Sequence, residues 1–189
     1  MDLGLKDRIA LVTGASCGLG RAICLAFAAE GAHVAVHHFD KRDSAVALCE
    51  QLRNCFGVRA FHIYADVTRE ADCEAMFDAV VAEFHHVDVL VNNAGLWPTS
   101  LVKDMSRQEW DHTVAVNLTG PFMLSRRMVR HLLETKRPGK IVNIVSQAAF
   151  QGATSGHAHY AAAKAGLVNL TVSLAREVAP YGILVNAVA

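Results

Sequence analysis

Three side chains in the last third of the chain have the types and spacing needed for acid–base chemistry: Ser146, Tyr160 and Lys164. Tyr160 and Lys164 stand four residues apart in an alanine-rich segment that is predicted to be helical, so their side chains share one helix face. A phenol titrates near ~10 in water, and a neighbouring ammonium stabilises the phenolate and moves its pKa toward neutrality. Ser146 follows the apolar run 141–145, which predicts a strand buried on both faces. Its hydroxyl could hold the substrate oxygen with which Tyr160 exchanges a proton.

A glycine-rich turn follows the first predicted strand. Residues 8–13 form a short apolar run, and Gly14, Gly18 and Gly20 come next, before a helical pattern over 21–30. Glycines let the backbone turn sharply and approach a pyrophosphate, which the positive N-terminus of the following helix attracts. The turn therefore indicates a dinucleotide site, since a mere connection has little need of three glycines.

Strands and helices alternate along the rest of the chain. Further strands are expected at 33–38, 58–65, 87–91 and 183–188, and further helices at 43–56, from a Thr68 cap to about 84, at 106–135 behind a Ser106/Glu109 capping box, and at 157–179. This alternation predicts an α/β fold, a Rossmann-type doubly wound parallel sheet with helices on both faces, in a single domain over residues 1–189. Ligands of such sheets bind at the carboxyl ends of the strands, where Gly14, Asp66, Asn92 and Ser146 fall.

The composition argues against several classes of protein. Hydrophobic residues make up 52% of the chain and 18 basic residues balance 18 acidic ones, which disfavours disorder and binding to nucleic acid or membrane surfaces. No apolar run approaches the ~20 residues of a membrane span and no signal peptide is evident, so a cytoplasmic protein is expected. Five cysteines without C-x-x-C spacing indicate reduced thiols. The ten histidines have no carboxylate or cysteine at ligand spacing, so no metal site is expected.

Together these motifs resemble the classical short-chain dehydrogenase/reductase family. The resemblance covers the whole chain in order and rests on Thr13-Gly14-x-x-x-Gly18-x-Gly20, Asn92-Asn93-Ala94-Gly95, Asn117, Ser146 and Tyr160-x-x-x-Lys164. The phrases KIVNIVS and YAAAKAGL are similar to bacterial reductases of the 3-oxoacyl-carrier-protein type.

The resemblance implies an NAD(P)(H)-dependent oxidoreductase that interconverts a ketone and a secondary alcohol. In that family Tyr160 would be the general acid/base, Lys164 would lower its pKa and bind the nicotinamide ribose, and Ser146 would polarise the carbonyl. Asn117 would complete a proton relay through water. The sequence adds a reason for that last role, because Pro121 has no N–H with which to bond the Asn117 carbonyl one helical turn earlier.

The resemblance also implies a set of cofactor contacts, with Asp66 at the adenine. The expected contacts are Thr13, Gly14, Ser16, Cys17, Gly18, Leu19, Gly20, His38, Asp66, Val67, Asn93, Ala94, Gly95, Tyr160 and Lys164.

Cofactor choice depends on the end of the second strand, where NAD-preferring members carry an acidic residue and this chain has His38. Asp40 lies two residues further on and could bind a ribose or cap the next helix. Lys41 and Arg42 could instead bind a 2′-phosphate. Cys17 stands where some NADP-dependent members place an arginine. The balance favours NADP(H).

Alternatives from other classes stay open. The family normally continues past a strand like 183–188 with a covering loop, a helix and a further strand, so we expect a chain that lacks the family's last strand and helix. Such a chain could be a fragment, or a dinucleotide-binding module with impaired turnover. An epimerase or dehydratase of the extended class shares Tyr-x-x-x-Lys, although the G-x-x-x-G-x-G spacing favours the classical type.

The helices expected at 106–135 and 157–179 carry apolar residues on more than one face. One sheet covers only one face of a helix, so the other faces need a partner. The resemblance implies pairing with their copies across a two-fold axis. We therefore expect a homodimer or homotetramer that acts on a small-molecule carbonyl or alcohol.

Overall fold

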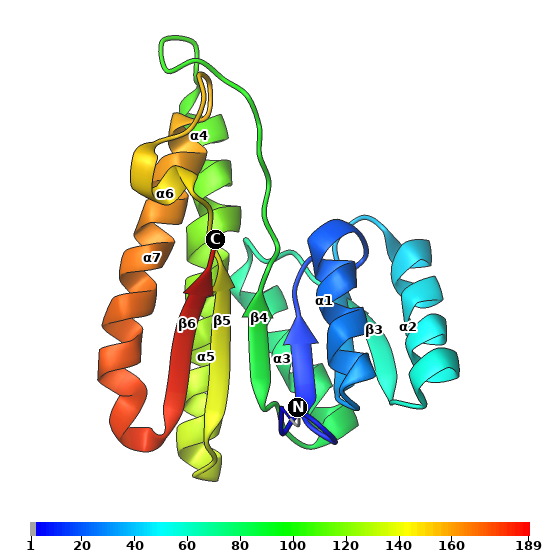
Figure 1. Ribbon diagram of the computed structural model, residues 1–189. Coiled ribbons are helices and arrows are strands. Elements are labelled where there is room, and N and C mark those ends of the chain that lie inside the picture. The colour runs from blue at the N-terminus through cyan, green and yellow to red at the C-terminus, as the bar shows by residue number, and fades with distance from the viewer. Residues whose placement is uncertain (1–2) are drawn as a thin grey trace.

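The alternating apolar segments form a parallel sheet of six strands in the computed structural model, which describes residues 3–189 (Figure 1). The strands are β1 (Ile9–Val12), β2 (His33–His38), β3 (Ala60–Tyr64), β4 (Val89–Asn92), β5 (Gly139–Ile144) and β6 (Ile183–Val188). Their order is β3-β2-β1-β4-β5-β6, with every neighbouring pair parallel. The chain reverses its direction of winding between β1 and β4, which is where ligands of such sheets bind. The predicted fold class is confirmed.

Helices cover the sheet in two layers with separate apolar cores (Figure 1). The layer packed on β1, β2 and β4 from one side contains α1 (Gly18–Ala29) and α2 (Arg42–Phe56). The other layer contains α3 (Glu70–Phe84), α5 (Gly120–Thr135) and α7 (Ala158–Val178). The strands β1 and β4 are buried along their whole length, as their runs of apolar residues predict.

Two short helices, α4 (Arg107–Val114) and α6 (Ala148–Gln151), lie beyond the carboxyl ends of the strands, beside the start of α7 (Figure 1). The Ser106/Glu109 capping box that opens α4 is present in full. Gly31 and Gly57 have φ values of 78° and 68° and end α1 and α2, because glycine adopts the left-handed conformation without a steric penalty.

Thr68 does not cap α3, and this expectation was wrong. The N-cap of α3 is Arg69, and its side chain makes no capping hydrogen bond. The Thr68 hydroxyl instead donates a 2.7 Å hydrogen bond to Asp66 Oδ1, which also accepts from the Thr68 backbone N–H at 2.9 Å. Asp66 therefore closes a local turn that delays the start of the helix.

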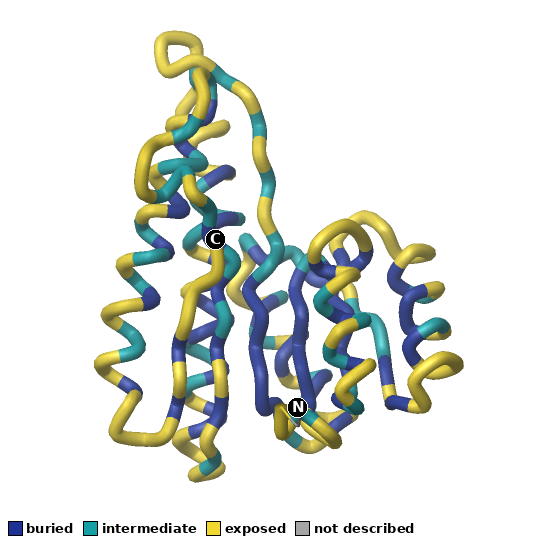
Figure 2. The backbone as a smooth tube through the Cα atoms, viewed as in Figure 1, coloured by how far each residue is buried: buried dark blue, intermediate teal, exposed yellow. Residues whose placement is uncertain are grey.

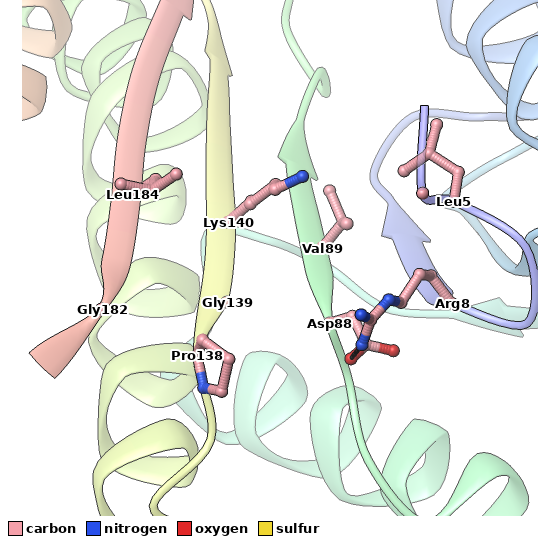
Figure 3. A pocket seen from close by; sticks show the side chains of 10 residues that line it. Leu5, Arg8, Asp88, Val89, Pro138, Gly139, Lys140, Gly182 and Leu184 are labelled. Atoms are coloured by element: carbon pink, nitrogen blue, oxygen red, sulfur yellow. Dashed lines mark hydrogen bonds and ion pairs between the residues drawn. The ribbon is translucent and has the colours of Figure 1, made fainter. Parts of the chain in front are cut away.

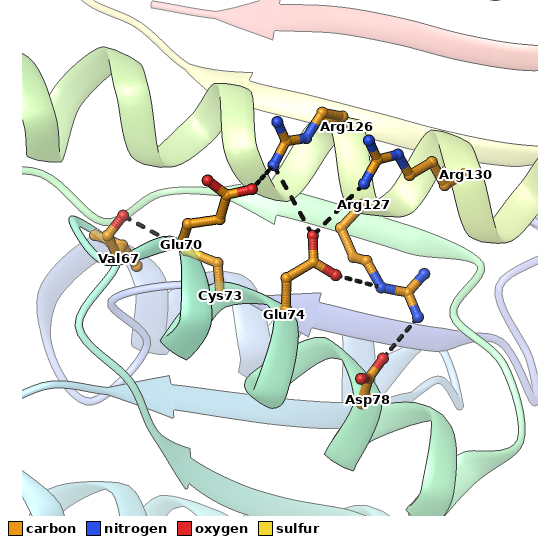
Figure 4. A network of polar contacts seen from close by, with 8 residues as sticks. All are labelled: Val67, Glu70, Cys73, Glu74, Asp78, Arg126, Arg127 and Arg130. Carbon is orange, nitrogen blue, oxygen red and sulfur yellow. Dashed lines mark hydrogen bonds and ion pairs between the residues drawn. The ribbon is translucent and has the colours of Figure 1, made fainter.

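Ion pairs join α3 to α5 on the outside of the second layer. Arg127 lies 3.0 Å from Glu74 and 2.6 Å from Asp78, and Arg126 pairs with Glu70 (Figure 4). The Arg127 guanidinium also lies 4.7 Å from the centroid of the Phe77 ring. Since three acidic residues at helical spacing on α3 face a row of arginines on α5, the pairs fix the register of these two helices.

At the opposite end of the sheet, Asp88 is a buried carboxylate that ties loops together. It accepts a 2.8 Å hydrogen bond from the Ile9 backbone N–H, and Arg8, His86 and Arg137 lie within 3.4 Å of it. Arg8 and Asp88 line a small hollow of about 150 Å³ at the amino ends of the strands (Figure 3). A buried carboxylate is stable only when it is paired in this way.

The strand β6 forms one edge of the described sheet, and much of it is exposed (Figure 2). Its Leu184 and Val188 are among the exposed residues. None of the helices within residues 3–189 is both long enough and apolar enough to cross a membrane.

Candidate active site and cofactor cleft

Lys164 links the helix α7 to the end of the strand β5. Its side chain is only 3% exposed, and Nζ donates a 2.7 Å hydrogen bond to the Ile144 carbonyl. Burial lowers the pKa of Lys164 to about 8, because desolvation disfavours the charged ammonium. Nζ lies 5.7 Å from the centre of the Tyr160 ring. The spacing of four residues therefore brings the phenol and the amine onto one face, as predicted.

Ser146 lies two residues beyond the carbonyl that Lys164 binds, just after β5. Its hydroxyl oxygen accepts a 3.2 Å hydrogen bond from the Ala148 backbone N–H. That bond uses one lone pair and leaves the hydroxyl hydrogen free to be donated. Ser146 thus follows the strand whose last carbonyl holds Lys164, and the Tyr160 ring lies beside that amine. This combination can polarise a carbonyl oxygen and protonate it.

Asn117 is buried in a widened helical turn between α4 and α5. Residues Ala115–Thr119 form a π-helix, in which the Gly120 N–H bonds the Ala115 carbonyl. Pro121 has no N–H with which to bond the Asn117 carbonyl, and a π-turn accommodates such a gap in the backbone hydrogen bonds. The Asn117 side chain donates 3.0 Å hydrogen bonds to the carbonyls of Leu96 and Thr113.

The carbonyl oxygen of the Asn117 side chain is buried and accepts no hydrogen bond from the described residues. A Cβ atom at Gly95 would lie 2.9 Å from this oxygen and 3.8 Å from Lys164 Nζ. The absence of a side chain at Gly95 therefore keeps a small space next to both polar groups. A buried polar atom without a partner is costly, so this space suits a water or a ligand hydroxyl.

A cleft of about 520 Å³ opens at the carboxyl ends of β1, β2 and β4. Most of the residues expected to contact the cofactor line it: Gly14, Ser16, Cys17, Gly18, Leu19, Gly20, Asp66, Val67, Asn93, Ala94 and Gly95. The structure thus gathers the glycine turn, the end of β3 and the Asn93–Gly95 segment around one space. Tyr160 and Lys164 are not among its lining residues and lie at the neighbouring end of β5.

Thr13 lies beneath the cleft and does not line it. Its side chain is buried, and Oγ1 accepts 2.9 Å hydrogen bonds from the backbone N–H groups of Asn93 and Ala94. The Asn93 amide in turn donates to the carbonyls of Thr13 and Gly14. The expected contact residue Thr13 therefore acts as a support that joins the glycine turn to the segment after β4.

His38 also lies outside the cleft, unlike the next residues along the chain. Its buried ring contacts His62 and Tyr64 on the neighbouring strand. Phe39, Asp40 and Lys41 line the cleft instead. Because successive side chains of a strand point to opposite faces of the sheet, His38 faces away from the cleft. The residues that follow the strand therefore occupy the part of the cleft where His38 was expected.

His37 is a site residue that the sequence did not reveal. Its Nδ1 accepts a 2.9 Å hydrogen bond from the Gly14 backbone N–H, and Nε2 lies 3.0 Å from the Ala65 carbonyl. Because a carbonyl only accepts, Nε2 carries the proton and the imidazole is neutral. Burial lowers the pKa of His37 to about 4, so the ring holds the glycine turn in place across the physiological range. The pair His37-His38 at the end of the strand is the feature of the sequence that could have indicated this role. Because neighbouring side chains of a strand point to opposite faces, one of the two histidines must face the glycine turn.

The glycine turn has the features of an anion site. The N-cap of α1 is Cys17, which makes no side-chain capping bond, and the first turn of α1 holds no acidic residue. The helix N–H groups are therefore free to bind a phosphate. A Cβ at Gly20 would lie 2.4 Å from the Gly14 carbonyl oxygen, whereas one at Gly18 would meet open space. The residues around the cleft thus fit a pyrophosphate-bearing dinucleotide.

Comparisons with known proteins agree with this arrangement. The profile of the family described as short chain dehydrogenase matches residues 8–189. The 3-oxoacyl-[acyl-carrier-protein] reductase FabG of Staphylococcus epidermidis is 43% identical over 183 residues, which cover 97% of this chain and 74% of that protein. FabG of Escherichia coli K12 is 41% identical and covers 99% of this chain and 74% of its own length. A crystal structure of a short chain dehydrogenase from Mycobacterium smegmatis superposes with a TM-score of 0.92 at 34% identity, over 97% of this chain and 76% of that one.

Proposed function

Because the chain belongs to the short-chain dehydrogenase/reductase family and is an NAD(P)-dependent enzyme of that family, we propose that it interconverts a ketone and a secondary alcohol with Tyr160 as the proton donor. The observation that carries the proposal is that Lys164, beside the Tyr160 ring, is bound to the last carbonyl of β5, two residues before Ser146 and close to Gly95 of the cleft. The bound nicotinamide supplies the hydride. The side chains of this chain orient the substrate carbonyl and transfer the proton.

Each polar group has its own task in the proposed reaction. The Ser146 hydroxyl donates to the carbonyl oxygen of the substrate and orients it, since one of its lone pairs already accepts from the Ala148 N–H and its hydrogen is available. Tyr160 gives its phenolic proton to that oxygen as negative charge develops there. The Lys164 ammonium, fixed by Ile144, stabilises the phenolate that remains. Asn117, whose Oδ1 accepts no hydrogen bond from the described residues and faces the space at Gly95, holds a water that returns a proton from solvent.

The cofactor assignment follows from the residues around the cleft. The α1 N-terminus and the glycine turn would hold the pyrophosphate, Asp66 and Val67 the adenine, and the segment 93–95 the nicotinamide side, since all of these residues line the cleft. Lys41 lines the cleft together with Asp40, and its ammonium favours NADP(H) because of the extra phosphate charge. Tyr160 and Lys164 would meet the cofactor at the end near β5.

The relatives suggest where to look for the substrate and the place of action. Two of them are named 3-oxoacyl-[acyl-carrier-protein] reductases, so 3-oxoacyl thioesters are the first compounds to assay here. We also propose that the chain acts in the cytoplasm as a homodimer or homotetramer.

The test is oxidation of NADPH and NADH, followed at 340 nm, with 3-oxoacyl thioesters and a panel of simple ketones. Turnover that appears only with a ketone present supports the proposal. Tight NADPH binding without turnover of any ketone would favour a binding module. Conversion of a sugar nucleotide without net oxidation of the cofactor would favour an epimerase.

A further inference from the structure

Trp97 forms an aromatic pair with His157 beside Tyr160. The Trp97 and His157 rings are stacked, with centroids 3.9 Å apart and planes inclined by 25°. The same indole meets the Tyr160 ring at 4.2 Å in a near-perpendicular arrangement. One aromatic side chain from the loop after β4 thus contacts two residues of α7, one of which is the proposed proton donor.

His157 is held in a single orientation by the loop that carries Trp97. Its Nδ1 lies 2.9 Å from the Pro98 carbonyl oxygen, so Nδ1 bears the proton, because a carbonyl can only accept. His157 is also the N-cap of α7, three residues before Tyr160, a spacing that brings their side chains to neighbouring positions on the helix. The indole therefore stacks on a support that the backbone fixes.

A second contact ties the two loops together. The Ser100 backbone N–H donates a 2.8 Å hydrogen bond to the Gly156 carbonyl. Gly156 has a φ of 87°, and a Cβ there would lie 2.8 Å from the Thr99 methyl group, so only glycine allows this close approach. The segment 97–100 is thus fastened to the start of α7, and Trp97 has little freedom to swing away.

Although it contacts two rings, Trp97 remains 48% exposed. Gly95 and Leu96 line the cofactor cleft, but Trp97 is not among the described residues that do so. The chain therefore leaves the cofactor cleft at Leu96 and places an exposed indole next to the proton donor, where a substrate must lie. An exposed aromatic surface that rests on a buried aromatic ring, here His157, is typical of a binding wall.

We infer that Trp97, supported by His157, forms the wall that receives the group attached to the substrate carbonyl, and that it selects ketones whose attached group is an aromatic ring. An aromatic ring gains from stacked or edge-to-face contact with indole beyond its area burial. A saturated ring of the same size gains only the area burial. This specificity rests on the proposed ketone chemistry, and it assigns Trp97 and His157 as specificity-determining residues.

The test compares acetophenone with cyclohexyl methyl ketone, which have the same number of carbon atoms. Dissociation constants are measured by titration calorimetry with the oxidised cofactor bound, so that no turnover is needed, and kcat/KM is measured separately. We expect acetophenone to bind roughly two- to tenfold more tightly. Trp97→Leu should remove this preference and Trp97→Phe should keep much of it. His157→Leu should weaken it, and His157→Phe should restore part of it by stacking.

Tyr181→Leu is the matched control, because Tyr181 is an exposed aromatic residue at the opposite end of α7. It should leave the preference unchanged. Equal affinities for the two ketones, or a preference that survives in Trp97→Leu, would overturn the aromatic wall even if turnover is normal. Failure to reduce any ketone would overturn the proposed function, while a preference in the binding data would still support the wall.

Discussion

The 2.7 Å hydrogen bond from Lys164 Nζ to the Ile144 carbonyl joins the helix that carries Tyr160 to the strand that delivers Ser146. A buried lysine normally pairs with a carboxylate, but the pKa of Lys164 is set by burial alone, with no neighbouring charge among its causes. The amine therefore loses its charge much closer to neutral pH than an exposed lysine does. Such a group can assist proton transfer without being neutralised by a fixed partner.

Tyr160→Phe tests the proton donor. The change removes only the hydroxyl, so the ring contact with Trp97 and the cofactor cleft should persist. We expect kcat to fall by about 10²- to 10⁴-fold, the usual contribution of a general acid, while the dissociation constant for the cofactor stays nearly constant. Steady-state rates and cofactor titration measure the two effects. If the variant of an active parent kept more than about a tenth of the rate, Tyr160 could not be the general acid.

The Lys164 amine predicts an alkaline limit to ketone reduction. Its pKa is lowered to about 8 by burial, so the side chain is an ammonium below that pH and loses its charge above it. If the ammonium stabilises the Tyr160 phenolate, kcat should fall as pH rises through about 8. Arginine stays charged throughout this range, so Lys164→Arg should move the limit upward in any variant that retains activity. A limit that stays in place would show that another group titrates.

The sequence predicted the fold and the shared helix face of Tyr160 and Lys164 because both depend on local spacing. Apolar runs define the strands, and Tyr160 and Lys164 share a face through helical periodicity alone. His37 and Trp97 could not be identified in this way. Their roles depend on which face of β2 meets the glycine turn and on a loop after β4 packing against α7, two tertiary relationships that leave no periodic pattern. The Thr68 cap failed for a similar reason, since Asp66 competed for its hydroxyl.

Cofactor choice is predicted to depend on Lys41. Lys41 lines the cleft and its Nζ lies 3.5 Å from Cys17 Sγ, so the ammonium is close to the start of α1. Lys41→Ala should weaken NADPH binding by about tenfold, as expected for a lost charge-assisted hydrogen bond, with a smaller effect on NADH. Arg42→Ala should act in the same direction. Lys140→Ala, at the amino ends of the strands, is the control. Equal losses for NADH and NADPH would argue against NADP(H) preference.

The cysteines offer a direct probe of the cleft. Cys17 and Cys55 are exposed, whereas Cys24, Cys49 and Cys73 are buried. Cys17 lines the cleft, while Cys55 lies near the end of α2. Bound NADPH should therefore slow alkylation of Cys17 by iodoacetamide and leave the rate at Cys55 unchanged, as read by peptide mass spectrometry. Alkylation of Cys17 at the same rate with saturating NADPH would place the cofactor elsewhere.

Self-association is predicted to use the outer faces of α5 and α7. Val172 on α7 and Phe122 on α5 are 46% and 43% exposed, while Leu167 of α7 is buried against the protein itself. Exposed apolar residues on two long helices gain from burial against a partner, and a two-fold axis would pair each helix with its copy. We expect a dimer at micromolar concentration by light scattering. Val172→Asp should shift it to monomers, because burying an unpaired carboxylate opposes association.

Val188→Asp is the control for this prediction. It changes an exposed valine on the edge strand β6 and should leave the dimer intact while reducing aggregation. A dimer lost through Val188→Asp but retained in Val172→Asp would assign the interface to the sheet edge, and a monomeric parent protein would refute the pairing of these helices.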